Sequence, residues 1–376
     1  MHDREPLRWT CWRAEPTKRV RRGSLEARGR SWPTPVFAAA SVTGSACAVD
    51  GAELVANGVR AVHVDPVAAD VFGLHGPLAR LEGPRAILGG DLLIVTGGGS
   101  RTLGQLPRGQ AVGGHGRLLR TEAGAIRFAS PVDGSVRLLS PGQSAWLQAE
   151  WEPDLATLPS PVATSAREDA TPDRVAIDLW RREAARVLRD QGVPFLVEAR
   201  DNEARDAEAR LDCARRWEAI GCDLGAVADA PGASPPEVSM RVAWWDCSPD
   251  SLDALFASQV DVVCSAVPAR LGRLGLAAGP TGWLDARSPS LAGRLDPLVD
   301  GCGCTTCLRF SASYLRHLLV ADELLGYRLL TLHNLWWAAR LVDDLKIPVP
   351  TAAPEDARAT PTRQQLTPYA TWSDPL

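Results

Sequence analysis

The stretch Gly301-Cys302-Gly303-Cys304-Thr305-Thr306-Cys307 gathers three of the nine cysteines of this 376-residue chain into one short turn. Its two glycines let the backbone bend tightly enough for three sulfurs to converge on one point. Thiolates at this spacing are typical ligands of zinc, which takes four protein ligands in structural sites. The stretch therefore predicts a metal site completed by a ligand from elsewhere. The alternatives are a thiol redox site and a coincidental cluster.

A pair of helices after the turn can supply the fourth ligand. Apolar spacing predicts one helix over Ser311–Leu325 and a second from about Leu329 to Leu345, with Gly326 and Tyr327 as the break between them. His333 lies in the first turns of the second helix, and a helix pair folding back on the turn would bring it to the metal. The result would be a closed Cys₃His site, which is structural rather than catalytic. His317 on the first helix is the competing ligand.

Composition and charge limit the classes of protein to which this chain can belong. Hydrophobic content of 45% and charged content of 23% are ordinary for a globular protein, and the net charge is −4. A protein of this charge is not a general electrostatic binder of nucleic acid, so any RNA site must be local. No run approaches the roughly 20 apolar residues of a membrane span, and the first residues lack the order of a signal peptide. We expect no membrane contact and a cytoplasmic location.

The six other cysteines show no disulfide framework and are expected to be reduced: Cys11, Cys47, Cys213, Cys222, Cys247 and Cys264.

The two ends of the chain differ from the middle. Residues 1–20 form a basic N-terminal arm within the arginine-rich stretch Arg4–Arg30, and the alternative is a solvated, partly disordered segment. Residues 347–376 are rich in Pro, Thr and Ala and predict a flexible tail without a core of its own. The folded unit is therefore expected to span residues 21–346.

Within that unit, apolar strand-like runs alternate with helical stretches. The runs are Leu92–Val95, Phe195–Glu198, Gly225–Ala228, Arg241–Trp245 and Val260–Ser265, and the helical stretches include Val175–Gln191 and Ala204–Gly221. Strands separated by helices of this length predict βαβ units and a parallel sheet. Periodicity alone does not separate a closed barrel from an open doubly wound sheet.

The cysteine turn and the two helices closely resemble the zinc subdomain of tRNA-guanine transglycosylases (queuine tRNA-ribosyltransferases). The match covers Asp300–Cys307, Ser311–Leu318 and Leu329–Leu335, and weaker similarity extends forward through Arg21–Leu25, Pro33–Phe37, Gly73–His75, Leu92–Gly99, Phe128–Ser135, Leu139–Pro141 and Val262–Arg273. In that family all four ligands hold zinc, which favours His333 over His317. The resemblance also implies a (β/α)₈ barrel with the zinc-binding helical subdomain, about residues 298–345, inserted near its C-terminal end.

The resemblance implies base exchange in tRNA, in which a carboxylate attacks the ribose, displaces guanine and yields to a 7-deazaguanine base. The chain departs from the family at the residues that perform it. Cys264 falls at the position of the nucleophilic aspartate and Thr96 at that of the second aspartate. The guanine-binding aspartate falls near Ser160, the family glutamine has no match in Leu196–Arg200, and a glycine loop becomes Ala228–Ala230. These departures indicate a divergent paralogue that lacks the catalytic aspartates.

Two interpretations of function stay open. The first is a zinc-stabilised, non-catalytic subunit, linked to queuosine-type tRNA modification, that binds tRNA or pairs with itself or with a catalytic transglycosylase. The second is an active transglycosylase with a different nucleophile, either the Cys264 thiolate or a carboxylate from Glu198, Asp229 or Asp261. Neither needs a nucleotide cofactor.

Two further pairs of residues bear on partners. Arg270 and Arg273 match the two arginines of the family that contact the anticodon loop, and the alternative for them is an ordinary solvated pair. Trp336 and Trp337 mark either a subunit contact or plain packing on the barrel.

Overall fold

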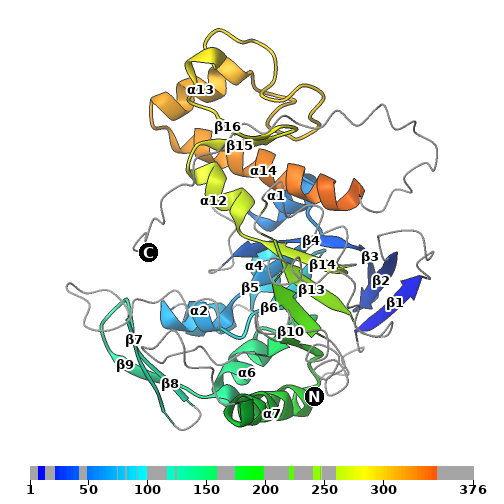
Figure 1. The fold of residues 1–376 in the computed structure, drawn as a ribbon, viewed down its shortest axis with the longest axis vertical. Coiled ribbons are helices and arrows are strands. Elements are labelled where there is room, and N and C mark those ends of the chain that lie inside the picture. Colours follow the sequence, from blue (N-terminus) through cyan, green and yellow to red (C-terminus); the bar gives the residue numbers. More distant parts are fainter. Residues whose placement is uncertain are drawn as a thin grey trace.

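The computed structural model describes the greater part of the chain. The described residues are 7–12, 22–41, 49–73, 75–80, 83–89, 91–99, 117–122, 125–158, 174–198, 220–223, 240–245, 247 and 260–344. Figure 1 shows a barrel in the lower half of the molecule and a smaller helical subdomain above it. The predicted tail 347–376 lies outside the described residues, as do Ser160 and Ala228–Ala230.

Eight parallel strands form a closed barrel, as the family resemblance implied. Around the barrel they run in the order β10, β11, β12, β13, β14, β4, β5 and β6. Their bounds are β4 Val36–Ser41, β5 Ala61–Val64, β6 Leu93–Thr96, β10 Leu155–Leu158, β11 Phe195–Glu198, β12 Ile220–Asp223, β13 Arg241–Trp244 and β14 Val262–Ser265. The pairing of β10 with β6 and of β14 with β4 closes the ring.

The sequence misplaced one part of this barrel. A helix was expected over Ala204–Gly221, but its last two residues belong to the barrel strand β12 Ile220–Asp223. The rest of that helix and the strand expected at Gly225–Ala228 lie outside the described residues. Ile220 and Gly221 are therefore strand residues, paired with Arg241 and Val242 of β13. A four-residue run of I-G-C-D carries too few apolar side chains to be recognised by periodicity, and pairing with both neighbouring strands decides its state.

A three-stranded antiparallel sheet covers the N-terminal end of the barrel. It consists of β1 Arg8–Trp12, β2 Arg22–Ala27 and β3 Arg30–Thr34, so part of the expected basic arm is an ordered strand. Leu25 and Trp32 of this sheet share one apolar cluster with Val36 and Leu93, which begin their barrel strands. The C-terminal ends of the strands are left for a site, as in other barrels of this kind.

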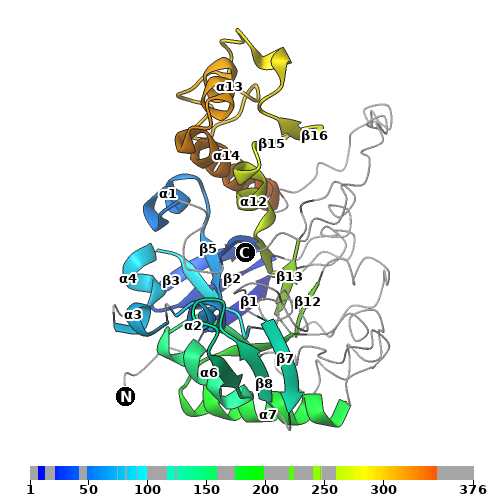
Figure 2. The ribbon, with the colours of Figure 1, turned by 90° about the vertical axis from the view of Figure 1, so that its left-hand side faces the viewer.

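Helices pack on the outside of the barrel, and a second small sheet flanks them. The helices are α1 Gly51–Ala56, α2 Pro66–Val71, α3 His75–Arg80, α4 Pro84–Leu88, α6 Pro141–Glu150 and α7 Arg174–Asp190, and the sheet is β7 Arg117–Glu122, β8 Ala125–Ala129 and β9 Val136–Leu139. Figure 2 shows α6 and α7 side by side at the bottom of the view, and they pack on the outside of β10 and β11. Helix α7 confirms the prediction for Val175–Gln191 to within one residue at each end.

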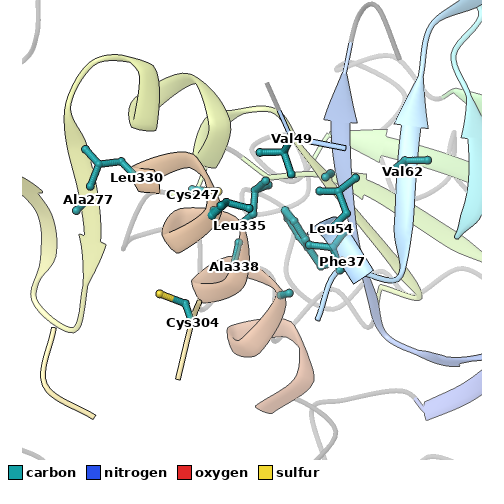
Figure 3. Packing of buried hydrophobic residues seen from close by; sticks show 14 of the residues in the cluster. Phe37, Val49, Leu54, Val62, Cys247, Ala277, Cys304, Leu330, Leu335 and Ala338 are labelled. Carbon is teal, nitrogen blue, oxygen red and sulfur yellow. The ribbon is translucent and has the colours of Figure 1, made fainter. Parts of the chain in front are cut away.

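The subdomain follows the last barrel strand. It contains α12 Val267–Arg273, the hairpin of β15 Leu276–Gly279 and β16 Gly282–Asp285, the short 3₁₀ turn Pro289–Leu291, α13 Ala312–Val320 and α14 Leu324–Asp344. Leu335 and Ala338 of α14 face Phe37 of β4 and Leu54 of α1, while Leu330 lies beside Ala277 of β15 (Figure 3). Helix α14 therefore belongs both to the barrel's outer layer and to the subdomain.

The break between the last two helices is not where the sequence indicated. Gly326 and Tyr327 are inside α14, and the chain reverses at Asp322, whose φ is +56°. A side chain at Gly326 would place its Cβ 3.0 Å from Leu318 Cβ. Glycine thus serves the close packing of α14 on α13, and that packing outweighs its cost of about 1 kcal/mol in a helix.

No helix in the described part of the chain is both long and apolar enough to cross a membrane.

Candidate metal centre and barrel mouth

The four predicted ligands lie together between the cysteine turn and α14. Their ligating atoms, the sulfurs of Cys302, Cys304 and Cys307 and a ring nitrogen of His333, are all within 4.8 Å of one another. His333 Nδ1 is 3.6 Å from the Cys302 sulfur and 3.4 Å from each of the other two. Three sulfurs and one imidazole nitrogen are a donor set that fits tetrahedral zinc.

The turn reaches this geometry through local contacts that its sequence supplies. Gly301 has a φ of +73°, which a residue with a side chain rarely adopts. The backbone N–H of Cys307 donates to the sulfur of Cys304 at 3.2 Å. The hydroxyl of the buried Thr306 donates to the carbonyl of Leu329 at 2.8 Å, which fastens the turn to α14.

The ring of His333 is fixed from its far side. Its Nε2 donates to the carbonyl of Ala278 in β15 at 2.8 Å, so that Nδ1 faces the sulfurs. A second partner of this kind sets both the tautomer and the orientation of a metal-binding histidine. The side chain is fully buried, so a ligand exchanged with solvent has no access at this position.

Contacts within the cluster shift the pKa values of its members. Burial lowers the pKa of His333, but hydrogen bonds with Cys302 and Cys307 outweigh it and raise the pKa to about 10. Hydrogen bonds with Cys302 and Cys304 lower the pKa of Cys307, while hydrogen bonds with Cys302 and Cys307 raise the pKa of Cys304. A divalent cation bound by these groups would take the place of their protons.

The competing ligand, His317, is excluded by its position. It lies on α13 with an exposed side chain and does not belong to the cluster. On the other side of the turn, Gly303 packs against Trp336, because a Cβ there would lie 3.3 Å from the indole ring. Trp336 and Trp337 are half-buried against the core, which agrees with plain packing.

Contacts on the barrel side hold the cysteine turn in place. The hydroxyl of Thr305 donates to the side-chain oxygen of Asn57, the residue that ends α1, at 3.0 Å. Arg328 of α14 forms an ion pair with Glu53 of α1. The Cys₃His cluster therefore lies at the junction of the subdomain and the barrel.

At the C-terminal end of the barrel, aromatic side chains meet across the interior. His63 of β5 and Trp244 of β13 make an edge-to-face contact with ring centroids 4.6 Å apart. Strands β14 and β4 lie between these two strands in the barrel order, so the contact spans the lumen rather than neighbouring positions. His63 is buried and Trp244 is half-buried, and Trp244 packs on the apolar cluster of the lumen.

The two residues at the family's aspartate positions occupy different environments. Cys264 belongs to the lumen cluster and is fully buried. Thr96 points to the helix layer, because its hydroxyl donates to Gln148 of α6 at 2.9 Å. Since side chains alternate along a strand, the inward position is Gly97. A Cβ at Gly97 would lie 2.8 Å from His63 Cε1, so the imidazole fills the space that a side chain would need there.

The other carboxylates considered from the sequence do not assemble a site among the described residues. Asp261 precedes β14 at the N-terminal end of the barrel and accepts a hydrogen bond from the Arg241 backbone at 2.8 Å, far from the mouth. Glu198 ends β11, but its side chain lies outside the described part, and so does Asp229.

A carboxylate placed at position 264 is expected to destabilise the protein. In Cys264→Asp the new group would be fully buried in an apolar cluster, and an uncompensated buried charge costs about 3–5 kcal/mol. Burial raises the carboxyl pKa in the folded state, so the loss is smallest below the unfolded pKa of about 4 and grows as the pH rises. Urea unfolding at pH 4 and pH 7 measures it. Cys264→Ser is the neutral control, and an equal loss for both variants at pH 7 would contradict the prediction.

Arg270 and Arg273 are exposed and share one face of α12. Neither forms an ion pair with a residue in the part of the chain that the structure describes. Leu274 beside them is 48% exposed. An arginine pair three residues apart on a helix can contact adjacent phosphates or base edges.

Comparison with known proteins gives one consistent result. The family model described as queuine tRNA-ribosyltransferase matches residues 235–350, which include the whole metal centre and α12. A queuine tRNA-ribosyltransferase of Dehalococcoides mccartyi is 24% identical, covering 89% of this chain and 87% of its own length. That of Syntrophobacter fumaroxidans is 27% identical over 84% and 86%, and that of Thermosipho africanus is 28% identical over 76% and 78%.

Proposed function

Because this chain belongs to the queuine tRNA-ribosyltransferase family, we propose that it is a zinc-stabilised, non-catalytic member that binds tRNA in queuosine-type modification. The observation that carries the proposal is the contact of His63 with Trp244 across the barrel lumen. In a base-exchange enzyme this end of the barrel must admit a purine beside a nucleophile. An imidazole and an indole occupy that space here. The nearby carboxylate of Asp65, whose Cγ would lie 3.6 Å from a Cβ at Gly97, caps α2 by accepting from the backbone N–H groups of Val67 and Ala68.

The alternative function, base exchange with Cys264 as nucleophile, lacks support from the contacts around this residue. Its side chain is fully buried in the apolar cluster that fills the lumen. Structural cysteines that are buried in this way are unreactive, because neither solvent nor substrate reaches the sulfur. A thioglycoside formed with ribose would also be slow to release.

Zinc is the metal that the donor set favours, and its proposed role is structural. All four protein ligands are present, which leaves no position for a catalytic water. When bound, the ion would neutralise the thiolates and connect the cysteine turn to α14. Cys302, Cys304, Cys307 and His333 would hold it.

The proposed partners are tRNA, in the cytoplasm, and a second subunit, either a copy of this chain or a catalytic transglycosylase. Exposed apolar side chains on the subdomain support a protein partner. Leu295 is 84% exposed, Leu308 71% and Leu324 83%.

The arginine pair on α12 gives the test of tRNA binding. We expect Arg270→Ala with Arg273→Ala to weaken tRNA binding by about 10- to 100-fold, which corresponds to about 1.4–2.8 kcal/mol. The slope of log affinity against log salt should fall by about 1 to 2, because up to two phosphate contacts are lost. Filter binding at several salt concentrations measures both quantities.

The control for this experiment is Arg186→Ala. Arg186 is an exposed arginine of α7 that forms an ion pair with Asp190 four residues further on. Its helix packs on α6, β10 and β11 rather than on α12. It should leave affinity and slope unchanged. Equal affinity of the double variant and the control would remove the support for an RNA site on α12.

A further inference from the structure

Two neighbouring side chains of α14 occupy one edge of strand β15. The other edge of β15 pairs with β16. In an antiparallel strand the backbone groups of alternate residues face the same edge. Asn334 accepts from Ala278 N–H at 2.8 Å and donates to the Leu276 carbonyl at 2.9 Å, and His333 donates to the Ala278 carbonyl. His333 and Asn334 therefore bind the edge of β15 as a neighbouring strand would.

The amide of Asn334 also reaches a third segment. Its nitrogen donates to the carbonyl of Pro268, in the first turn of α12, at 3.0 Å. The side chain is fully buried, so these hydrogen bonds do not compete with water. The orientation of the amide is fixed by its partners, because the reverse orientation would place its oxygen against two carbonyls.

Helix α12 lies directly against α14 at this point. A Cβ at Gly272 would be 2.8 Å from the backbone nitrogen and Cα of Thr331, which is two residues before the ligand His333. Only glycine permits such an approach. Helix α12, which carries Arg270 and Arg273, therefore contacts α14 within one helical turn of the ligand His333.

We infer that Asn334 is a positioning residue shared by the metal centre and the arginine helix. It holds β15 so that the Ala278 carbonyl fixes the ring of His333, and it holds the first turn of α12 with the same amide. Metal occupancy and the order of α12 are then coupled, and by linkage each stabilises the other. The identity of the metal and of the RNA rests on the proposed function, but the coupling can be measured without RNA.

The test uses the full chain loaded with zinc and the variant Asn334→Ala. Zinc affinity, measured by competition with a chelator, should fall about 10- to 100-fold, as for other partners of metal ligands. In hydrogen exchange at saturating zinc, the amides of residues 267–279 should lose protection while those of β5 keep it.

Gln148→Ala is the matched control. Gln148 is a fully buried amide of α6 that donates to the Thr157 carbonyl and accepts from Thr96, remote from the metal. It should lower stability without changing zinc affinity or the exchange of residues 267–279. Equal zinc affinity and equal exchange in the two variants would overturn the inference.

A second measurement covers the case that Asn334→Ala does not fold. Zinc is withdrawn from the unmodified protein in steps, and exchange is followed at each step. Protection of residues 267–273 should fall in proportion to the zinc released. Full protection there after complete release would overturn the coupling. Failure of the protein to bind tRNA would refute the proposed function only, because neither readout involves RNA.

Discussion

Cys304→Ser and His333→Ala are each expected to abolish stoichiometric zinc and to unfold the subdomain. Both side chains are buried at the centre of the ligand cluster, and removal of either leaves an incomplete site. A metal present at about 1,000 times its dissociation constant contributes about 4 kcal/mol to stability. Its loss should lower the melting temperature by about 6 °C in a folded unit of this size, because the unfolding entropy is about 2.1 cal/mol/K per residue. Elemental analysis and calorimetry on the same samples measure both effects.

His317→Ala is the control for these variants, because His317 lies on the adjacent helix α13 with an exposed side chain. It should retain one zinc per chain and an unchanged melting temperature. A metal-free protein that melts at the temperature of the zinc-loaded protein would contradict a structural role for the site.

The Cys₃His cluster was predictable because its signal is local. The spacing of three cysteines around Gly303 needs only a tight turn, and a helix pair was enough to bring one histidine to it. The resemblance to the transglycosylases selected His333 over His317, and the geometry agrees. Asn334 was passed over although it stood within the matching segment, since its role depends on the edge of β15, which sequence did not place beside it.

The barrel mouth was harder to predict, because strand register decides which side chains enter it. A shift of one residue exchanges the inward and outward faces of a strand. Thr96 and Gly97 are adjacent in sequence, yet only Gly97 faces the lumen and Thr96 bonds to α6. The contact of His63 with Trp244 joins residues about half the chain apart and leaves no local pattern.

Base exchange is expected to be absent from this protein. The reaction needs a carboxylate nucleophile and room for a purine. At the described mouth, position 264 is a buried thiol paired in register with Trp244, whose ring contacts His63. Transglycosylase rate enhancement depends on the positioned nucleophile. Its absence should therefore remove guanine incorporation rather than merely slow it, and Cys264→Ala should change nothing.

The most direct test incubates the zinc-loaded protein with tRNA and labelled guanine, measuring tRNA binding and label incorporation in the same mixture. The Cys264→Ala variant is run beside it, and an active transglycosylase serves as the positive control. We predict that tRNA is bound and that incorporation stays at the protein-free background for both forms. Robust incorporation by the unmodified protein that vanishes in Cys264→Ala would contradict this account and make Cys264 the nucleophile of an enzyme.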